Sequence, residues 1–437
     1  MISGIKAIKE GATAYRAIST LAALMVVGLL GLKGREIAGA ALQNATALAL
    51  AASWREAMAD PSSLFECSPR GNAAAAWALA EAALRLKPED AHAWLLRGRS
   101  AWLAGRCVEA REAWRHAVAL APQDPAAWLL YILSGPPDLR PEPAIAEGIA
   151  KYLDFQGERA RRAERWEEAL KWYERSLALA PSVSRANRLE SVYLKLDRKT
   201  EAIARWKALA AVWPETDPGH WWALGRMAEL SEDWEQAARF YGEGAGRSDA
   251  PYEYRMRQGA ALERLKDWAG AEAAYRRAVE ARPDLPWPYL SVGHMRRVRK
   301  DYDGMLEWYR KAEAIAPNHY EPQHWLGYAH YIREEYAEAQ KHLERALELN
   351  PQHPWSAYYL AWSLYKQGRQ EEAVSWLRTA IGLYPGQPWQ WAVQLGDWLA
   401  EAGDKDGALA AYRQALAWKP GDEGIEAKIR ALGGNQP

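Results

Sequence analysis

Histidines and acidic pairs are the residues of this chain that could hold a metal ion or transfer a proton, but their spacing supports neither role. The nine histidines include no HExxH pair. His319, His324 and His330 stand five and six residues apart, so a helix would not bring them to one face. Acidic pairs such as Glu334 and Glu335 lie at expected helix starts, where the helix dipole stabilises carboxylates. We expect no metal site and no cofactor.

Motifs for nucleophilic catalysis or nucleotide binding do not occur in the sequence either. There is no GxxxxGK[ST] loop and no GxSxG motif. Gly242, Gly244 and Gly246 weaken the helix in which they stand, so we expect them to end it rather than to hold a phosphate. The sequence therefore predicts a protein that is not an enzyme.

Charge and cysteine content exclude further classes. Lysine plus arginine and aspartate plus glutamate both number 56, and the formal net charge of zero provides no overall attraction for nucleic acid, which we do not expect as a partner. The two cysteines, Cys67 and Cys107, are too few for a disulfide framework and lack the spacing of a zinc site. We expect both to be ordinary thiols.

Tryptophan and tyrosine dominate the aromatic residues, because the chain has 24 Trp and 21 Tyr but only 3 Phe. Phenylalanine would fill apolar space without a polar atom, so this preference suggests that many rings have one edge in contact with water or a ligand. Packing between helices can also require large rings. The composition leaves both roles open.

Proline recurs with a fixed period that divides the chain into units. Pro283, Pro317, Pro351 and Pro385 are 34 residues apart, and Pro420 follows after 35. A period of this length is typical of a repeat made of two helices. The proline ends the second helix, so the next unit can begin.

Residue spacing inside the units predicts how the two helices pack. Trp221, Leu224, Gly225 and Ala228 stand at i, i+3, i+4 and i+7, which form one stripe of a first helix. The small residues of this stripe let the second helix approach closely. Each pair can bury its remaining apolar face only against neighbouring pairs, so the units stack into a solenoid without a central core.

The units resemble tetratricopeptide repeats. In the unit from Ala91 to Asp124, the residues at the positions that this family requires to be large, small or helix-ending are Trp94, Gly98, Ala101, Ala110, Trp114, Ala117 and Pro122. Further units begin near Ala150, Val183, Pro218, Tyr252, Pro286, Tyr320, Pro354 and Trp389. The resemblance implies an all-α fold, a right-handed superhelical solenoid of about nine to ten tetratricopeptide helix pairs preceded by an N-terminal hydrophobic helix.

The predicted domain order follows from these units and from the one break in their period. Residues 133–143, LSGPPDLRPEP, read as a loop that interrupts the period. The expected segments are 1–36, a hydrophobic or transmembrane helix; 37–90, a lead-in helix and degenerate first repeat; 91–124, one repeat; 125–149, an irregular insertion; 150–420, eight repeats; and 421–437, a C-terminal cap and tail.

Residues 17–32 form an uncharged segment, AISTLAALMVVGLLGL, between Arg16 and Lys33. As a helix it spans roughly 24 Å, which approaches the roughly 30 Å of a bilayer core when the flanking cations reach outward. This predicts a membrane anchor, with a cleaved signal peptide and a self-associating hydrophobic helix as alternatives. More cations precede the segment than follow it, so we expect the repeat domain outside the cytoplasm, in the cell envelope or extracellular, while a cytoplasmic orientation stays open.

In the tetratricopeptide family, the first helices line a concave surface that binds partners through their second, fifth, sixth, ninth and twelfth residues. The resemblance implies a partner-binding groove made of Trp287, His294, Arg297, His324, Trp325, Tyr328, Tyr331, Trp355, Tyr358, Tyr359, Trp362 and Tyr365. It also gives the earlier units a more basic lining, from Arg99, Arg162, Arg188, Arg226 and Arg257. The alternative, that several of the rings only pack between adjacent first helices, stays open.

Two classes of function remain. The first is a non-enzymatic, tryptophan-rich interaction scaffold, anchored to a membrane through residues 17–32, that binds an extended peptide, a protein or a glycan in the aromatic groove. The second is a self-assembling subunit that forms a homo-oligomer, filament or lattice through its hydrophobic N-terminal helix and the ends of its solenoid.

Overall fold

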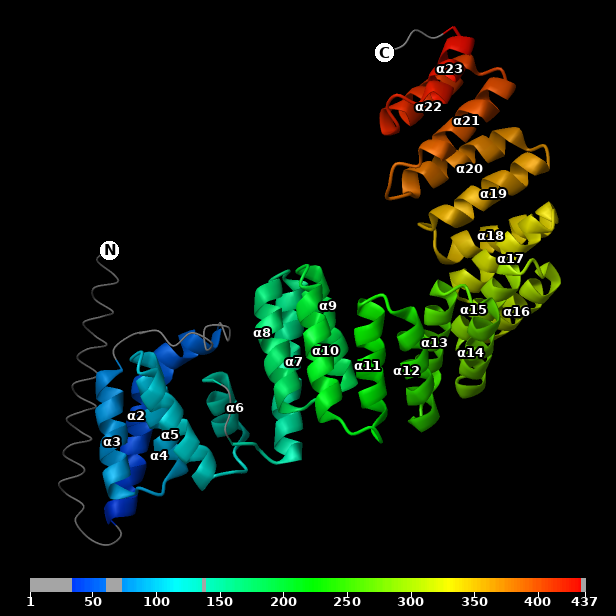
Figure 1. The fold of residues 1–437 in the computed structure, drawn as a ribbon. Coiled ribbons are helices and arrows are strands. Elements are labelled where there is room, and N and C mark those ends of the chain that lie inside the picture. Colours follow the sequence, from blue (N-terminus) through cyan, green and yellow to red (C-terminus); the bar gives the residue numbers. More distant parts are fainter. Residues whose placement is uncertain (1–33, 60–72, 136–138, 434–437) are drawn as a thin grey trace, which may run out of the picture. The chain divides into compact units, whose positions relative to one another are not determined.

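The computed structural model describes residues 34–59, 73–135 and 139–433, which form twenty-two α-helices and no strand. The all-α prediction is therefore confirmed for the described residues. The helices, labelled in Figure 1, are α2 Gly34–Ala59, α3 Ala74–Leu86, α4 Ala91–Leu103, α5 Cys107–Leu120, α6 Pro125–Leu133, α7 Pro143–Arg162, α8 Trp166–Leu179, α9 Val183–Lys195, α10 Lys199–Val212, α11 Pro218–Leu230, α12 Trp234–Arg247, α13 Tyr252–Arg264, α14 Trp268–Ala281, α15 Pro286–Val298, α16 Tyr302–Ile315, α17 Tyr320–Ile332, α18 Tyr336–Leu349, α19 Pro354–Lys366, α20 Gln370–Leu383, α21 Trp389–Glu401, α22 Lys405–Trp418 and α23 Glu423–Ala431.

The chain divides into two compact units, Met1–Arg205 and Trp206–Pro437. In the first unit α2 packs against α3, α4 against α5, and α7 against α8. In the second unit the packed pairs are α11 with α12, α13 with α14, α15 with α16, α17 with α18, α19 with α20, and α21 with α22. Consecutive helices thus pack in pairs within each unit, as the period predicts.

The two helices of a pair meet where a glycine of the first faces a large side chain of the second, sixteen residues later. A Cβ added to Gly225 would lie 2.6 Å from Cε1 of Tyr241. The same close approach joins Gly98 to Trp114, Gly157 to Tyr173, Gly259 to Tyr275, Gly293 to Tyr309, Gly327 to Leu343 and Gly396 to Tyr412. Packing this tight leaves no room for a methyl group, because protein interiors are close-packed.

Aspartates fix where many second helices begin. Asp233, Asp267, Asp301 and Asp404 each precede a second helix and accept a hydrogen bond from the backbone N–H three residues later, at 2.9 to 3.1 Å. Such a bond satisfies an N–H that the helix itself leaves without a partner. Local sequence therefore sets the start of these helices.

Residues 125–149, expected as an irregular insertion, are largely helical. They contain α6 and the first turns of α7, so α7 is 20 residues long and begins before the expected Ala150. Pro125 stands in the first turn of α6, and the carboxylate of Asp124 accepts a hydrogen bond from the N–H of Ala126 at 2.9 Å. The helix forms because its apolar residues, including Trp128 and Tyr131, are buried.

The three glycines expected to end a helix do not end it. Helix α12 continues through Gly242, Gly244 and Gly246 to Arg247. Gly244 is buried, and a Cβ there would lie 2.4 Å from Cε1 of Tyr254 on α13. The glycine therefore serves the close contact with α13, which a local reading of helix propensity could not show.

Two further expectations need correction. No helix within the described ranges is both long and apolar enough to cross a membrane. The predicted anchor over residues 17–32 lies outside the described residues, so the membrane-anchored, extracytoplasmic location is left without support and we withdraw it.

The expectation for Cys107 was wrong as well. This residue, expected to be an ordinary thiol, is disulfide-bonded.

Candidate functional site

A pocket of about 610 Å³ lies on the second unit, lined by the first helices of three consecutive pairs. Its residues on α15 recur every three or four positions, which places them on one face of the helix, and the same holds for α17. The lining residues are Trp287, Leu290, Ser291, His294 and Arg297 from α15, Tyr320, Glu321, His324, Trp325 and Tyr328 from α17, and His353, Trp355 and Tyr359 from the start of α19.

Aromatic rings that contact one another edge to face form the walls. The ring centroid of Trp325 lies 4.2 Å from that of His294 and 4.9 Å from that of His324. Tyr328 and Tyr359 lie 4.8 Å apart in the same arrangement. Contacts of this geometry hold rings in defined orientations. The pocket therefore has preformed, mostly apolar walls.

Two tryptophans of the pocket remain accessible. Trp287 is 36% exposed and Trp355 is 39% exposed, whereas tryptophan is usually well buried. Both stand near the start of their helices, on α15 and α19. An exposed indole at the edge of a pocket offers apolar area together with one N–H donor, as binding sites for peptides commonly do.

Hydrogen bonds through Ser356 hold two imidazoles of the pocket. The backbone N–H of Ser356 donates to Nδ1 of His353 at 3.3 Å, so this nitrogen is an acceptor. The Ser356 hydroxyl also lies 2.8 Å from Nδ1 of His353 and 3.0 Å from Nδ1 of His324. We assign the tautomers from this network: Nδ1–H of His324 donates to the hydroxyl, which donates to His353.

Burial keeps the imidazoles of the pocket neutral. Burial, together with the imidazoles of His353 and His294, lowers the pKa of His324 to about 3. Burial and the charge of Arg297 lower the pKa of His294 to about 4. Burial also lowers the pKa of His353. A buried base loses its charged form because the interior solvates charge poorly. The pocket therefore has one cationic lining residue at neutral pH, Arg297.

Arg297 stands in the last turn of α15 and has no carboxylate partner among the described residues. Its guanidinium carbon lies 5.9 Å from the ring centroid of Tyr328, and its Nε is buried without a hydrogen-bond acceptor. Its neighbours differ, because Arg296 and Arg299 both pair with Glu272, at 2.8 and 3.1 Å. A partly desolvated cation without a partner favours an anionic group from a ligand.

Glu321 is the acidic residue of the lining and stands at the opposite end of the pocket. It lies in the first turn of α17, where its Oε1 accepts a hydrogen bond from the hydroxyl of Tyr320 at 3.1 Å. Tyr328, beside Arg297, is seven residues further along the same helix, a rise of about 10 Å. The pocket is thus uncharged in the middle, cationic at one end and anionic at the other.

The structure divides the twelve residues predicted for the groove into two groups. Eight line the pocket: Trp287, His294, Arg297, His324, Trp325, Tyr328, Trp355 and Tyr359. The other four, Tyr331, Tyr358, Trp362 and Tyr365, pack against the core of the last helix pairs. On α21, Trp391 stacks on Tyr358 with centroids 4.5 Å apart, and Trp398 stacks on Tyr365 at 4.3 Å.

The sequence reasoning missed five lining residues for two reasons. Leu290, Ser291 and Glu321 occupy the fifth, sixth and second places of their helices, which the repeat pattern already indicated, but they are not aromatic. Tyr320 and His353 lie outside those places. His353 is the residue before α19 and caps that helix, a role that only the hydrogen bonds reveal.

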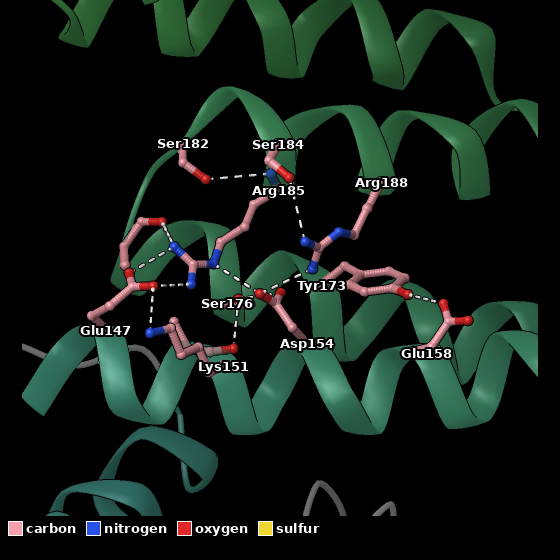
Figure 2. A network of polar contacts seen from close by, with 12 residues as sticks. Glu147, Lys151, Asp154, Glu158, Tyr173, Ser176, Ser182, Ser184, Arg185 and Arg188 are labelled. Carbon is pink, nitrogen blue, oxygen red and sulfur yellow. Dashed lines mark hydrogen bonds and ion pairs between the residues drawn. The ribbon is translucent and has the colours of Figure 1, made fainter. Parts of the chain in front are cut away.

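A second polar cluster lies in the first unit and is closed by its own ion pairs (Figure 2). Arg185 on α9 reaches down between two acidic residues of α7. Its Nε donates to Asp154 at 3.1 Å, and its two terminal nitrogens donate to Glu147 at 2.9 Å. The hydroxyl of Ser176 on α8 lies 2.7 Å from the other oxygen of Asp154. This network joins three helices and leaves no unpaired charge for a ligand.

Carboxylates also neutralise most of the basic lining that was predicted for the earlier units. Arg162 pairs with Glu158 at 2.8 Å, and Arg188 pairs with Asp154 at 3.1 Å. Arg226 and Arg257 both pair with Glu229, at 2.6 and 2.9 Å. Of the predicted arginines, Arg297 differs from these four because no carboxylate among the described residues neutralises it.

Within the described part of the chain, no group of three or more His, Cys, Asp or Glu side chains could hold a metal ion. The three imidazoles of the pocket belong to separate helices or turns, and each has its Nδ1 in a hydrogen bond. The expectation that the chain is not an enzyme stays a prediction.

Comparison with known sequences identifies the repeats. One sequence model of the tetratricopeptide repeat matches residues 70–131, 231–286 and 326–388, and a second matches residues 153–186. The third of these stretches includes the second half of α17, with Tyr328 of the pocket, and all of α19. No curated protein matches the sequence.

The solved structures that match this chain share little sequence with it. The Cut9–Hcn1 hetero-tetramer of the APC/C matches 97% of this chain and 95% of its own, with 14% identity and a TM-score of 0.45. YrrB, described as a tetratricopeptide repeat protein with an unusual peptide-binding site, matches 44% of this chain and 100% of its own, with 18% identity and a TM-score of 0.37. TTC0263, a thermophilic repeat protein from Thermus thermophilus, matches 41% and 98%, with 19% identity and a TM-score of 0.34.

Proposed function

We propose that this chain, which belongs to the tetratricopeptide repeat family, is an interaction scaffold that binds an extended peptide segment of another protein in the pocket between α15, α17 and α19. Tetratricopeptide repeats generally bind proteins or peptides, and the pocket lies on first helices. The observation that carries the proposal is a preformed 610 Å³ pocket with aromatic walls, two exposed tryptophans and an unpaired arginine.

A peptide fits the pocket better than a glycan does. Extended peptides are bound by aromatic grooves in which a few polar groups fix the orientation. The pocket has formal charges of opposite sign at its ends, Arg297 and Glu321, and a peptide can carry both charges whereas a neutral sugar carries neither. Self-assembly, the alternative expected from the sequence, finds no specific support among the described residues and we do not propose it.

The test is a display library of random extended peptides selected on the full chain. We expect enriched peptides to bind the unaltered protein and to lose at least about tenfold in affinity when Trp287 and Trp355 are both changed to Ala. These rings are partly exposed, so their removal should leave the helices folded. Tyr302→Ala is the matched control, because Tyr302 is 37% exposed but lies outside the pocket. Unchanged affinity in the double variant, or no enrichment over it, would refute the proposal.

A further inference from the structure

The charges of the pocket indicate which peptide sequences it binds. This inference rests on the proposed function. We propose that the pocket selects a peptide segment with an acidic residue and a basic residue three positions apart, the acidic side chain at Arg297 and the basic side chain at Glu321. The two residues between them occupy the uncharged middle of the pocket.

The unpaired state of Arg297 is the first step. Its Nε is buried without an acceptor, and no carboxylate among the described residues pairs with it. Elsewhere on the first helices, Arg185 and Arg226 are buried and each has a carboxylate partner at 2.6 to 3.1 Å. A ligand carboxylate that accepts two hydrogen bonds from the terminal nitrogens of Arg297 would give this residue the partner that the other two already have.

The neutral imidazoles are the second step, because they leave the pocket without competing charges. His294 and His324 lie between the two charged ends and have pKa values of about 4 and 3. Both are therefore uncharged at neutral pH. A ligand anion has one cationic partner in the pocket, and a ligand cation has one anionic partner, so the charges define where each end of the ligand lies.

The third step is the distance along α17 between the two charged ends of the pocket, which sets the spacing of the charged residues in the peptide. Glu321 and Tyr328 are seven residues apart, a rise of about 10 Å, and Arg297 lies against the ring of Tyr328. An extended chain advances about 3.3 Å per residue and a polyproline helix about 3.1 Å, so three positions cover about 9 to 10 Å. Between the ends, Trp325 and Leu290 present apolar surface, which suits proline or other apolar residues.

Fluorescence anisotropy with four amidated, fluorescein-labelled peptides tests the inference on the full chain. The peptides contain Glu-Pro-Pro-Lys, Gln-Pro-Pro-Gln, Glu-Pro-Pro-Glu and Lys-Pro-Pro-Lys between glycine flanks. We expect Glu-Pro-Pro-Lys to bind about tenfold or more tightly than Gln-Pro-Pro-Gln, the size of effect expected for hydrogen bonds to charged groups. Raising the salt concentration should reduce this difference.

Variants of the protein in which one charge of the pocket is reversed test the inference most directly. Arg297→Glu makes both ends anionic, so it should prefer Lys-Pro-Pro-Lys, whereas Glu321→Lys should prefer Glu-Pro-Pro-Glu. Lys341→Glu is the control, since Lys341 is exposed on α18 and outside the pocket, and it should keep the original preference. If Arg297→Glu lowers the thermal midpoint, Arg297→Gln replaces it and should lose discrimination between Glu-Pro-Pro-Lys and Lys-Pro-Pro-Lys.

Each outcome separates the inference from the proposed function. Equal affinity for charged and neutral peptides, with both still lost in the Trp287 and Trp355 double variant, would overturn the inference and leave the pocket a peptide site. Preferences that do not change in the charge-reversal variants would overturn the inference as well. If none of the four peptides binds, the inference is wrong, and the display selection decides separately whether the pocket binds peptides of another kind.

Discussion

The ring of Tyr275 on α14 lies so close to Gly259 on α13 that a Cβ at residue 259 would stand 2.5 Å from its Cε1. Tyr275 is 3% exposed and cannot move away without displacing its neighbours. We therefore expect Gly259→Ala to destabilise the second unit by about 1 to 3 kcal/mol, although alanine is the better helix former. Urea unfolding followed by circular dichroism measures the change.

Gly246 is the matched control for that substitution. It also lies within a helix, α12, but a Cβ there would meet nothing within 4 Å. Gly246→Ala should leave stability unchanged or raise it by up to about 1 kcal/mol. Equal destabilisation by both substitutions would show that helix packing does not require the glycine at residue 259.

A hydrogen bond from the hydroxyl of Tyr241 offers a reason why the second helices carry tyrosine rather than phenylalanine. It donates to Oε2 of Glu229 at 2.6 Å, on the partner helix of the pair. Tyr241→Phe keeps the ring against Gly225 but removes this bond, so we expect a loss of about 1 kcal/mol in the free energy of unfolding. Tyr302→Phe, at an exposed position, should change nothing measurable. A Tyr241→Phe variant as stable as the parent would contradict the role of the hydroxyl.

Arg185 and Asp154 form a buried pair whose coupling a double-mutant cycle can measure. Arg185 is 7% exposed and Asp154 is 9% exposed. Removing either partner leaves the other with its second ion pair, Glu147 for Arg185 and Arg188 for Asp154, so each single change to Ala should cost about 1 to 3 kcal/mol, while the double change should cost less than their sum. Chemical denaturation of the full chain, followed through a signal from the first unit, gives the free energies of unfolding of the parent, the two single variants and the double variant.

The exposed pair Arg369 and Glu372 serves as the reference for that cycle. Their nitrogen and oxygen lie 2.6 Å apart, yet both side chains are at least 40% exposed. Exposed pairs of this kind couple by about 1 kcal/mol or less. Coupling of equal size in the two cycles would mean that burial adds nothing to the Arg185 pair.

The low pKa of the His324 imidazole predicts that the folded chain loses stability on mild acidification. Its pKa is about 3 in the folded chain against an ordinary value of 6.5, so between these values the unfolded chain binds a proton that the folded chain does not. Stability should therefore fall as the pH drops from 6.5 toward 3, by about 2 kcal/mol between pH 6.5 and 5 for this residue.

Replacement of His324 by Asn tests this slope. Unfolding free energies of the parent and of His324→Asn between pH 7 and 5 should converge as the pH falls, whatever the absolute loss in the variant. His92→Gln, at an exposed position on α4, should keep the slope of the parent. A slope that is identical in the parent and in His324→Asn would refute a neutral, buried imidazole at residue 324.

Sequence alone determined the helix pairs of this protein, because their determinants lie within one repeat. The glycine of the first helix, the large side chain sixteen residues later and the proline that closes the unit are all local in sequence, as Gly259, Tyr275 and Pro283 illustrate. Each repeat states the same contacts again, so a period of 34 residues was enough to predict them. The exceptions were contacts between neighbouring repeats, such as Gly244 against Tyr254.

Only the tertiary structure decided which aromatic and charged residues are open to a ligand. Trp362 and Tyr328 both occupy the ninth place of their first helices, yet Trp362 packs against Trp398 in the core of the last helix pairs, whereas Tyr328 lines the pocket. Likewise Arg185 meets carboxylates from α7, whereas no carboxylate among the described residues meets Arg297. Whether a side chain is covered or paired depends on residues one or more repeats away, and no pattern within a repeat contains that information.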